Sequence, residues 1–208
     1  MKKIVIIDYG AGNIRSLINA FEYQNINAEA TNDKTKIKNA THLVLPGVGA
    51  FPTAMQLLHD QKIIDLLKSH CFKKKPFLGI CLGMQMMFDF SSEIKSTKGL
   101  GLIEGNVQKL PENETHKSKF KIPNIGWYKL LKNTNNHKID FFDTYYSCYF
   151  VHSFHCLPKD QNKVLFYSNF NDYKFCSAIC YENLLGFQFH PEKSRDPGLN
   201  LLKQFSNM

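Results

Sequence analysis

The sequence lacks an apolar run of membrane-spanning length. The apolar segment from Pro76 to Phe88 is too short for that purpose and contains Gln85. Internal repeats and low-complexity linkers are also missing, so we expect residues 1–208 to form a single domain. The chain opens directly into Lys3-Ile-Val-Ile-Ile-Asp8, without the pattern of a signal peptide. These absences predict a cytoplasmic protein with no membrane association.

Metal-binding cysteine patterns are absent as well. The six cysteines include no C-x-x-C pair, and Cys176 and Cys180 lie in a segment of strand composition. His152 and His155 would face opposite sides of a strand, because side chains alternate along it. We therefore expect no metal site, and reduced thiols in a cytoplasmic protein.

Arginine is scarce although the chain is basic. The 26 basic and 18 acidic residues give a formal net charge of +8, but only Arg15 and Arg195 are arginines. The basic residues are not interleaved with aromatic residues, as they are in RNA-binding modules. Solvated lysine faces explain the charge better, and we expect no nucleic-acid partner.

Short apolar segments alternate with amphipathic ones in the first half of the chain. This order predicts an α/β fold with a mostly parallel central sheet and helices on both faces. From about Gly101 the pattern changes to short strands and turns, which predicts an antiparallel C-terminal portion. The expected strands are 3–8, 27–30, 42–45, 76–80, 145–154, 163–170, 175–181 and 184–189, and the expected helices are 12–22, 54–68, 82–88 and 198–205.

Cys81 stands between an expected strand and an expected helix. Gly79 and Gly83 flank it in a G-x-C-x-G pattern, the cysteine counterpart of a nucleophile elbow. A thiol at a helix N-terminus faces the positive end of the helix dipole, which favours the thiolate. The other reading is a buried structural cysteine, which is common for free thiols. The paired glycines favour the nucleophile.

A histidine and a carboxylate follow the last expected strand. Pro191 biases His190 toward an extended conformation, and residues two apart in an extended segment point to the same side. Glu192 could then reach the imidazole and orient it. An ordinary surface turn is the alternative for this tripeptide alone, but the elbow makes a Cys-His-Glu system the better interpretation.

These motifs together resemble the class I glutamine amidotransferase family. The elbow Gly79-Ile-Cys-Leu-Gly-Met-Gln85 and His190-Pro-Glu192 carry the resemblance. Ile7-Asp-Tyr-Gly-Ala-Gly-Asn13, Leu45-Pro-Gly-Val-Gly-Ala-Phe51 and Tyr149-Phe-Val-His-Ser153 narrow it to the glutaminase subunits of imidazole glycerol phosphate synthase. The resemblance spans nearly the whole chain.

The resemblance implies a role for each matching residue. Cys81, His190 and Glu192 would hydrolyse L-glutamine through a thioester. Val48, Gly49 and Leu82 would form the oxyanion hole. Residues that would bind the substrate are Gly47, Gln85, Glu93, His152 and Ser153, with Glu93 placed about three helical turns past the nucleophile. No metal or organic cofactor is implied.

The resemblance also implies a partner. In the family, ammonia passes to a (β/α)8 cyclase that docks on the glutaminase as a heterodimer. Asn13, Trp127 and Lys193 match positions near the docking face, although Trp127 could equally be a core residue. Asn124 and Tyr128 stand where the family usually has His and Asn. A different synthase, such as one acting on surface sugars, is therefore an alternative partner.

Two other classes of function stay open. A cysteine peptidase or γ-glutamyl hydrolase of similar fold would cleave larger substrates, whereas the Gly47-Val48-Gly49 loop, Gln85 and Glu93 suit a small amino acid. A non-catalytic regulatory module with a relic triad is the remaining alternative.

Overall fold

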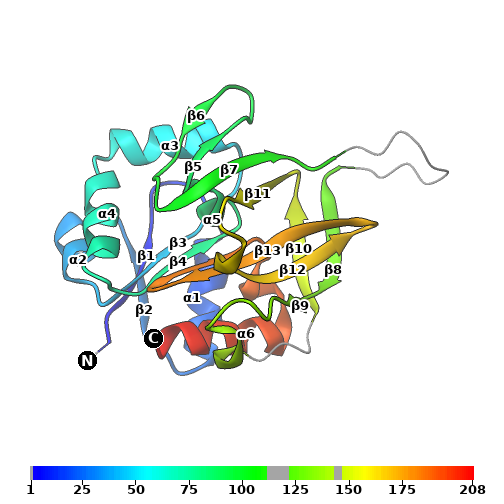
Figure 1. The fold of residues 1–208 in the computed structure, drawn as a ribbon. Helices are drawn as coiled ribbons and strands as arrows, with labels where there is room; N and C mark the ends of the chain where they lie inside the picture. Colours follow the sequence, from blue (N-terminus) through cyan, green and yellow to red (C-terminus); the bar gives the residue numbers. More distant parts are fainter. Residues whose placement is uncertain (1, 112–121, 143–146) are drawn as a thin grey trace.

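Parallel strands form one half of the central sheet. The computed structural model describes residues 2–111, 122–142 and 147–208 (Figure 1). The parallel strands lie in the order β2-β1-β3-β4-β14, with each neighbouring pair parallel. Their bounds are β1 Ile4–Ile7, β2 Ala28–Thr31, β3 His42–Leu45, β4 Phe77–Ile80 and β14 Leu184–Phe187.

The other half of the sheet is mainly antiparallel, as the sequence predicted. It continues from β14 in the order β13-β11-β7-β5-β6, with β12 beside β13 and β9 beside β12. Among the described strands of this half, only β5 and β7 pair in parallel. The bounds are β5 Phe88–Ser91, β6 Thr97–Lys98, β7 Ile103–Lys109, β9 Leu131–Lys132, β11 Phe154–Pro158, β12 Val164–Phe170 and β13 Tyr173–Tyr181. A separate ribbon pairs β8 (Asn124–Lys129) with β10 (Ser147–His152).

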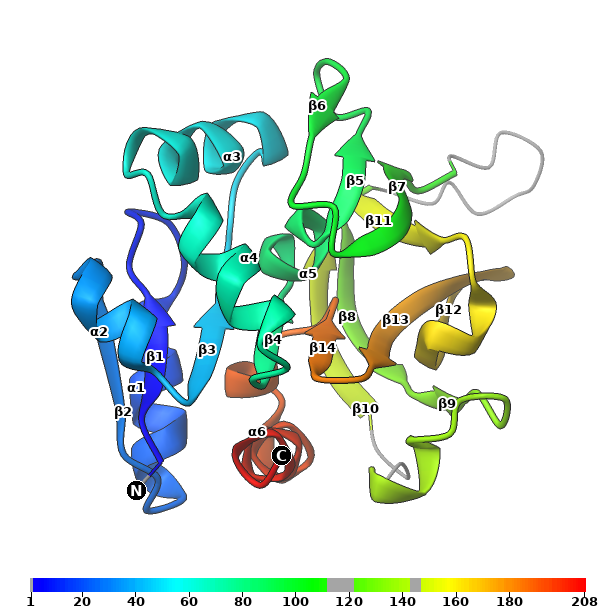
Figure 2. The ribbon, with the colours of Figure 1, turned by 60° about the vertical axis from the view of Figure 1, so that its left-hand side comes forward.

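Helices cover both faces of the parallel half (Figures 1 and 2). Helices α1 (Ile14–Tyr23) and α6 (Arg195–Ser206) pack with Ile4 and Ile6 of β1. On the other face, α2 (Lys34–Asn39), α3 (Phe51–Asp60) and α4 (Ile64–Phe72) join a second apolar cluster. Each strand residue points to the face opposite its neighbour, so this half is buried on both sides. The α/β class expected from the sequence is confirmed.

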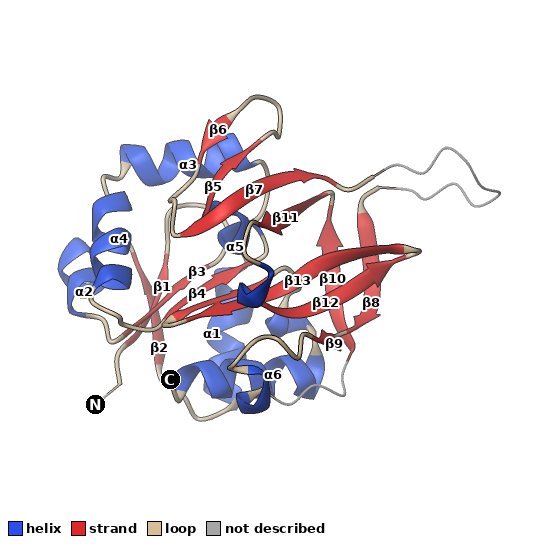
Figure 3. Ribbon diagram, viewed as in Figure 1, coloured by secondary structure: helices blue, strands red, loops and turns tan. Residues whose placement is uncertain are grey.

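Several elements differ from the sequence expectation. The single helix expected over 54–68 is two helices, because Lys62 adopts a positive φ of 55° between them. The helix expected over 82–88 ends at Met86, and Phe88 already begins strand β5. The strand expected over 145–154 is β10 followed by β11, which lie in different sheets; its first two residues fall outside the described part of the chain. Figure 3 shows the helices around the parallel strands and mostly strands beyond them.

The carboxyl ends of the parallel strands meet at one edge of the sheet. Tyr9 follows β1, the loop 46–50 follows β3, Cys81 follows β4 and His190 follows β14. The Tyr9 hydroxyl donates to the carbonyl oxygen of Pro46 over 2.9 Å, so two of these ends are in direct contact. Ligands of open α/β sheets bind at such an edge. No helix in the described ranges is long and apolar enough to cross a bilayer.

Candidate active site

Cys81 occupies a sharp turn between β4 and the short helix α5 (Leu82–Met86). Its backbone has φ 53° and ψ −111°, a conformation that non-glycine residues rarely adopt. The Cys81 amide donates to the carbonyl oxygen of Phe187 over 2.7 Å, which ties the turn to β14. Strained residues held by their surroundings are typical of active sites.

Both flanking glycines are required by close packing. A Cβ on Gly79 would lie 2.7 Å from the backbone oxygen of Gly83, and a Cβ on Gly83 would lie 1.8 Å from that of Leu45. The helix α5 can therefore sit against β3 and β4 only because these positions have no side chain. The G-x-C-x-G pattern thus follows from the geometry of the turn.

His190 and Glu192 form a buried pair next to this turn. His190 Nδ1 lies 2.8 Å from Oε1 of Glu192, and their side chains are only 5% and 1% exposed. Glu192 reaches the ring from a 3-10 turn, Pro191–Lys193, and not from the extended segment expected from the sequence. Ser194 fixes this turn, since its hydroxyl donates to the His190 carbonyl over 2.6 Å.

The environment of His190 favours the imidazolium. Burial alone would lower its pKa, but the interactions with Cys81 and with the hydrogen-bonded Glu192 raise the pKa of His190 to about 10. Nε2 of the ring meets no hydrogen-bond partner of normal geometry within the described residues. The Cys81 sulfur instead contacts the Val151 carbonyl oxygen at 3.9 Å and Nε2 of Gln188 at 3.8 Å. The sulfur and the imidazole therefore interact electrostatically, without a formed hydrogen bond.

A cavity of about 290 Å³ opens over Cys81 and His190. Most of the residues expected to contact the substrate line it: Val48, Gly49, Leu82, Gln85, Glu93, His152 and Ser153, together with Val151 and Phe154. Glu192 lies behind His190, outside the lining. A larger cavity of about 500 Å³ lies beside Pro76, at the amino end of β4, and contains neither Cys81 nor His190.

The loop after β3 packs against the elbow. A Cβ on Gly47 would lie 2.9 Å from both the Tyr9 hydroxyl and Cβ of Leu82, so Gly47 lies beneath the cavity and not among its lining residues. Gly49 has φ +90°, which favours glycine. Val48 is 46% exposed. The loop thus brings Val48 and Gly49 to the cavity wall.

Gln85 and Glu93 approach the cavity from different kinds of structure. Gln85 lies on α5, and its Nε2 donates to the carbonyl oxygen of Phe154 at 2.9 Å and to Oε1 of Gln188 at 3.1 Å. Glu93 follows strand β5, so the expectation that it lies three turns along the same helix is wrong. Its Oε2 accepts from the amide of Phe51 over 2.7 Å.

His152 is a neutral, fully hydrogen-bonded member of the wall. Burial lowers the pKa of His152 to about 3. Because its Nδ1 lies 2.8 Å from the Phe154 carbonyl oxygen, Nδ1 must carry the proton. Nε2 then accepts from Asn124, 2.9 Å away. Asn124 is one of the two residues that differ from the usual family motif, and its hydrogen bond to Nε2 holds the His152 ring in this orientation.

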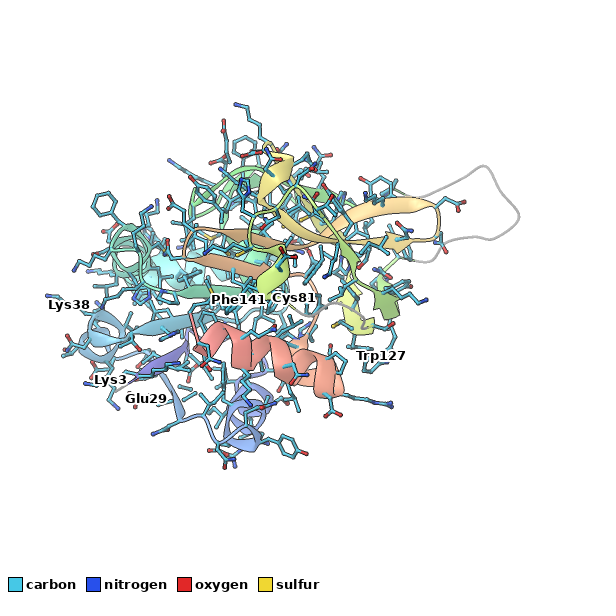
Figure 4. The ribbon with its side chains drawn as sticks, turned by 60° about the horizontal axis from the view of Figure 1, so that its bottom comes forward. Lys3, Glu29, Lys38, Cys81, Trp127 and Phe141 are labelled. Atoms are coloured by element: carbon cyan, nitrogen blue, oxygen red, sulfur yellow. The ribbon has the colours of Figure 1, made fainter. Side chains whose placement is uncertain are left out.

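The three residues expected at a partner interface lie outside the cavity. Asn13 precedes α1 and is half-buried, and Lys193 is exposed. Trp127 is 46% exposed, with the Arg195 guanidinium 5.3 Å from its ring centroid, so it is not a core residue. Figure 4 shows Trp127 at the edge of the molecule, near one end of α6.

Gln188 and the anchoring roles of Tyr9 and Ser194 were not predicted from the sequence. Tyr9 and Ser194 hold the two loops, and Gln188 contacts the sulfur. A glutamine between Phe187 and Phe189 in a buried strand was a usable signal, because buried polar side chains need partners. No group of three or more His, Cys, Asp or Glu side chains in residues 2–111, 122–142 and 147–208 could hold a metal ion.

Comparison with known proteins gives a consistent family. Residues 5–207 match the family model for class I glutamine amidotransferases. The chain is 41% identical to imidazole glycerol phosphate synthase subunit HisH 2 of Vibrio vulnificus, covering 98% of this chain and 93% of that protein. It is 40% identical to the HisH subunit of Aquifex aeolicus, covering 98% and 95%. PurLQS of Thermotoga maritima shares the fold with a TM-score of 0.73 at 18% identity, covering 99% of this chain and 98% of that chain. The chain belongs to the class I glutamine amidotransferase family.

Proposed function

We propose that this chain is the glutaminase subunit of an imidazole glycerol phosphate synthase. The observation that carries the proposal is the Cys81 elbow beside His190, which Glu192 holds at 2.8 Å, with Cys81 and His190 both lining a cavity of about 290 Å³. The named function of the Vibrio vulnificus and Aquifex aeolicus relatives supports the pathway.

The proposed reaction is hydrolysis of L-glutamine to glutamate and ammonia. The Cys81 sulfur attacks the side-chain amide carbon, His190 takes the thiol proton, and Glu192 keeps the imidazole oriented. His190 then gives a proton to the leaving nitrogen, and ammonia departs as the thioester forms. A water molecule, deprotonated by His190, hydrolyses the thioester and restores the thiol.

The oxyanion of each tetrahedral intermediate needs donors that are already in place. We assign the backbone amide of Leu82 and the amides of the Val48–Gly49 segment to this role. Leu82 begins α5 directly after the nucleophile, and the Val48–Gly49 segment borders the same cavity. Glu93 offers a carboxylate for the substrate α-ammonium, while Gln85, His152 and Ser153 line the remaining wall.

The ammonia needs an acceptor on another chain. We propose a (β/α)8 cyclase as partner, docked over the face that carries Asn13, Trp127 and Lys193. The half-exposed Trp127 suits such a contact, because aromatic residues are enriched at interfaces. All six cysteines are free, which suits the reducing cytoplasm where we place this activity.

A direct test is glutamine hydrolysis by the purified chain, alone and with its cyclase. Wild-type protein should release glutamate and ammonia, and Cys81→Ala should release none while still binding the cyclase. Equal activity of the two proteins would end the proposal. A panel of peptides should stay uncut, since the cavity is small for a peptide.

A second acceptor synthase is favoured by one observation. Asn124 replaces the family's usual histidine and hydrogen-bonds to His152, and Tyr128 replaces its usual asparagine nearby. If the partner differs, the histidine-pathway cyclase and its ribonucleotide substrate will not support coupled turnover, although glutamine hydrolysis persists. Full coupled turnover would rule out this alternative.

A further inference from the structure

Gln188 is a buried amide that points at the reacting sulfur. It is 0% exposed, and its Nε2 lies 3.8 Å from Cys81 Sγ. Phe187 and Phe189 stack against each other at 4.8 Å and belong to the apolar cluster shared with α1 and α6. Because side chains alternate along an extended chain, Gln188 points the other way, toward the elbow.

The orientation of this amide is set by a chain of hydrogen bonds. The Phe154 carbonyl oxygen can only accept, so the Gln85 atom 2.9 Å away must be its NH₂ group. That NH₂ group also donates to Gln188, 3.1 Å away, which must therefore present its oxygen. The NH₂ group of Gln188 is thereby directed to the sulfur. The Phe154 carbonyl oxygen thus determines, through Gln85, that the NH₂ end of the Gln188 amide faces Cys81.

Few other groups of the described chain can stabilise charge on this sulfur. His190 is the cation beside it, with Glu192 behind. Burial, and then the charge of Cys81, raise the pKa of Tyr9, so its hydroxyl stays neutral. Burial, Cys176 and Cys81 likewise raise the pKa of Cys156. The Val151 carbonyl oxygen, 3.9 Å away, accepts from the thiol and offers nothing to the thiolate.

We propose that Gln188 is a positioning residue for the nucleophile, whose amide N–H stabilises the Cys81 thiolate and holds the sulfur below the cavity. Hydrogen bonds to a charged acceptor are stronger than those to a neutral one, so the contact strengthens when the proton leaves. The inference rests on the proposed function, because it takes Cys81 as the nucleophile. Gln188 does not line the cavity, so it acts through the sulfur and not through the substrate.

The test is alkylation of Cys81 by iodoacetamide, measured from pH 5 to 10 by mass mapping of the modified peptide. Iodoacetamide is uncharged and reacts with the thiolate, so its rate reports thiolate population without the oxyanion hole. Gln188→Met keeps a similar volume but removes the donor. We expect about a three- to tenfold slower reaction at pH 7, the range of one net hydrogen bond, and a rate midpoint at higher pH.

Gln188→Glu separates a donor role from a packing role. A carboxylate near the sulfur opposes a second negative charge, so this variant should react more slowly than Gln188→Met at pH 7. Gln85→Met removes the bond that orients Gln188 and should have a smaller effect, not additive with Gln188→Met. In glutamine hydrolysis, Gln188→Met should lower kcat and leave KM unchanged, whereas Gln85→Met should raise KM.

Asn133→Leu is the matched control. Its amide is also buried, donating to the carbonyl oxygens of Gln161 and Val164 at 2.8 Å, but it lies away from the cavity. It should lower the thermal midpoint and keep the wild-type alkylation profile. A wild-type profile in Gln188→Met, or the same slowing in Asn133→Leu, would overturn the inference. If the wild-type chain hydrolyses no glutamine, the proposed function fails instead, which is a separate result.

Discussion

The amide of Phe51 donates to Oε2 of Glu93 over 2.7 Å. Phe51 is the first residue of α3, directly after the loop that carries Val48 and Gly49, and Glu93 follows β5. The carboxylate proposed to bind the substrate therefore also holds one end of the proposed oxyanion loop. The Tyr9 hydroxyl holds the other end at Pro46.

This double use of Glu93 predicts different effects for two substitutions. Glu93→Gln can still accept from Phe51 but loses the charge, so KM for glutamine should rise about ten- to a hundredfold, with kcat little changed. Glu93→Ala loses the loop anchor as well, and its kcat should fall too. Steady-state glutaminase kinetics distinguish the two. An unchanged KM in Glu93→Gln would remove Glu93 from substrate binding.

Tyr9→Phe tests the other anchor. The substitution keeps the buried ring and removes the bond to Pro46, so kcat should fall about tenfold while KM stays constant, at a cost in stability of about 1 kcal/mol. Alkylation of Cys81 by iodoacetamide should keep its wild-type rate, because that reaction needs no oxyanion hole. Equal losses in both reactions would show that Tyr9 supports the elbow and not the loop.

The Cys-His-Glu system predicts an order of losses. His190→Ala should lower kcat about a thousandfold or more, because the thiol then has no base. Glu192→Ala should cost less, since the turn anchored by Ser194 still holds the His190 ring near the sulfur. The measurement is ammonia release in single-turnover assays. A larger loss in Glu192→Ala than in His190→Ala would contradict the assigned roles.

The raised pKa of His190, about 10, predicts how stability depends on pH. The folded chain holds the proton more tightly than the unfolded chain, whose histidine titrates near 6.5. This contribution is fully present below about pH 6.5 and is lost as the pH rises through about 10. The thermal midpoint of the wild type should therefore fall over that range. Glu192→Gln, which removes one source of the shift, should show a smaller fall.

Cys81→Gly and Cys81→Ala form a pair that isolates backbone strain. Both remove the sulfur, but only glycine adopts φ 53° without cost. The glycine variant should be about 1–3 kcal/mol more stable than the alanine variant. At an ordinary helix or strand position, a protein with glycine is commonly less stable than the same protein with alanine. Urea denaturation of both variants at one pH measures their free energies of unfolding and shows which variant is the more stable.

Local sequence signals were sufficient for the part of the site built from short turns. The glycines around Cys81 and the proline after His190 specify backbone geometry directly, so the elbow and the His190 segment could be predicted. The parallel strands were visible as apolar runs alternating with amphipathic segments, so the parallel half of the sheet could also be predicted.

Elements that depend on distant pairing could not be predicted in the same way. Met87 and Phe88 continue the apolar run after the elbow, and a short apolar run does not distinguish helix from strand. Because β5 pairs with β7, the chain forms a strand from Phe88 onward. Glu93 therefore follows a strand and does not lie on the helix where we expected it. The break at Ser153, where the chain leaves one sheet for another, likewise depends on separate partners for β10 and β11.

The backbone of Cys81, the proposed nucleophile, also determines what a substitution at this position would do. A single substitution at position 81 to glycine would relax the turn and abolish the chemistry at once. A glycine at this position would therefore give a more stable but inactive protein. The strained turn at residue 81 therefore works against stability and is explained by the proposed chemistry of its thiol.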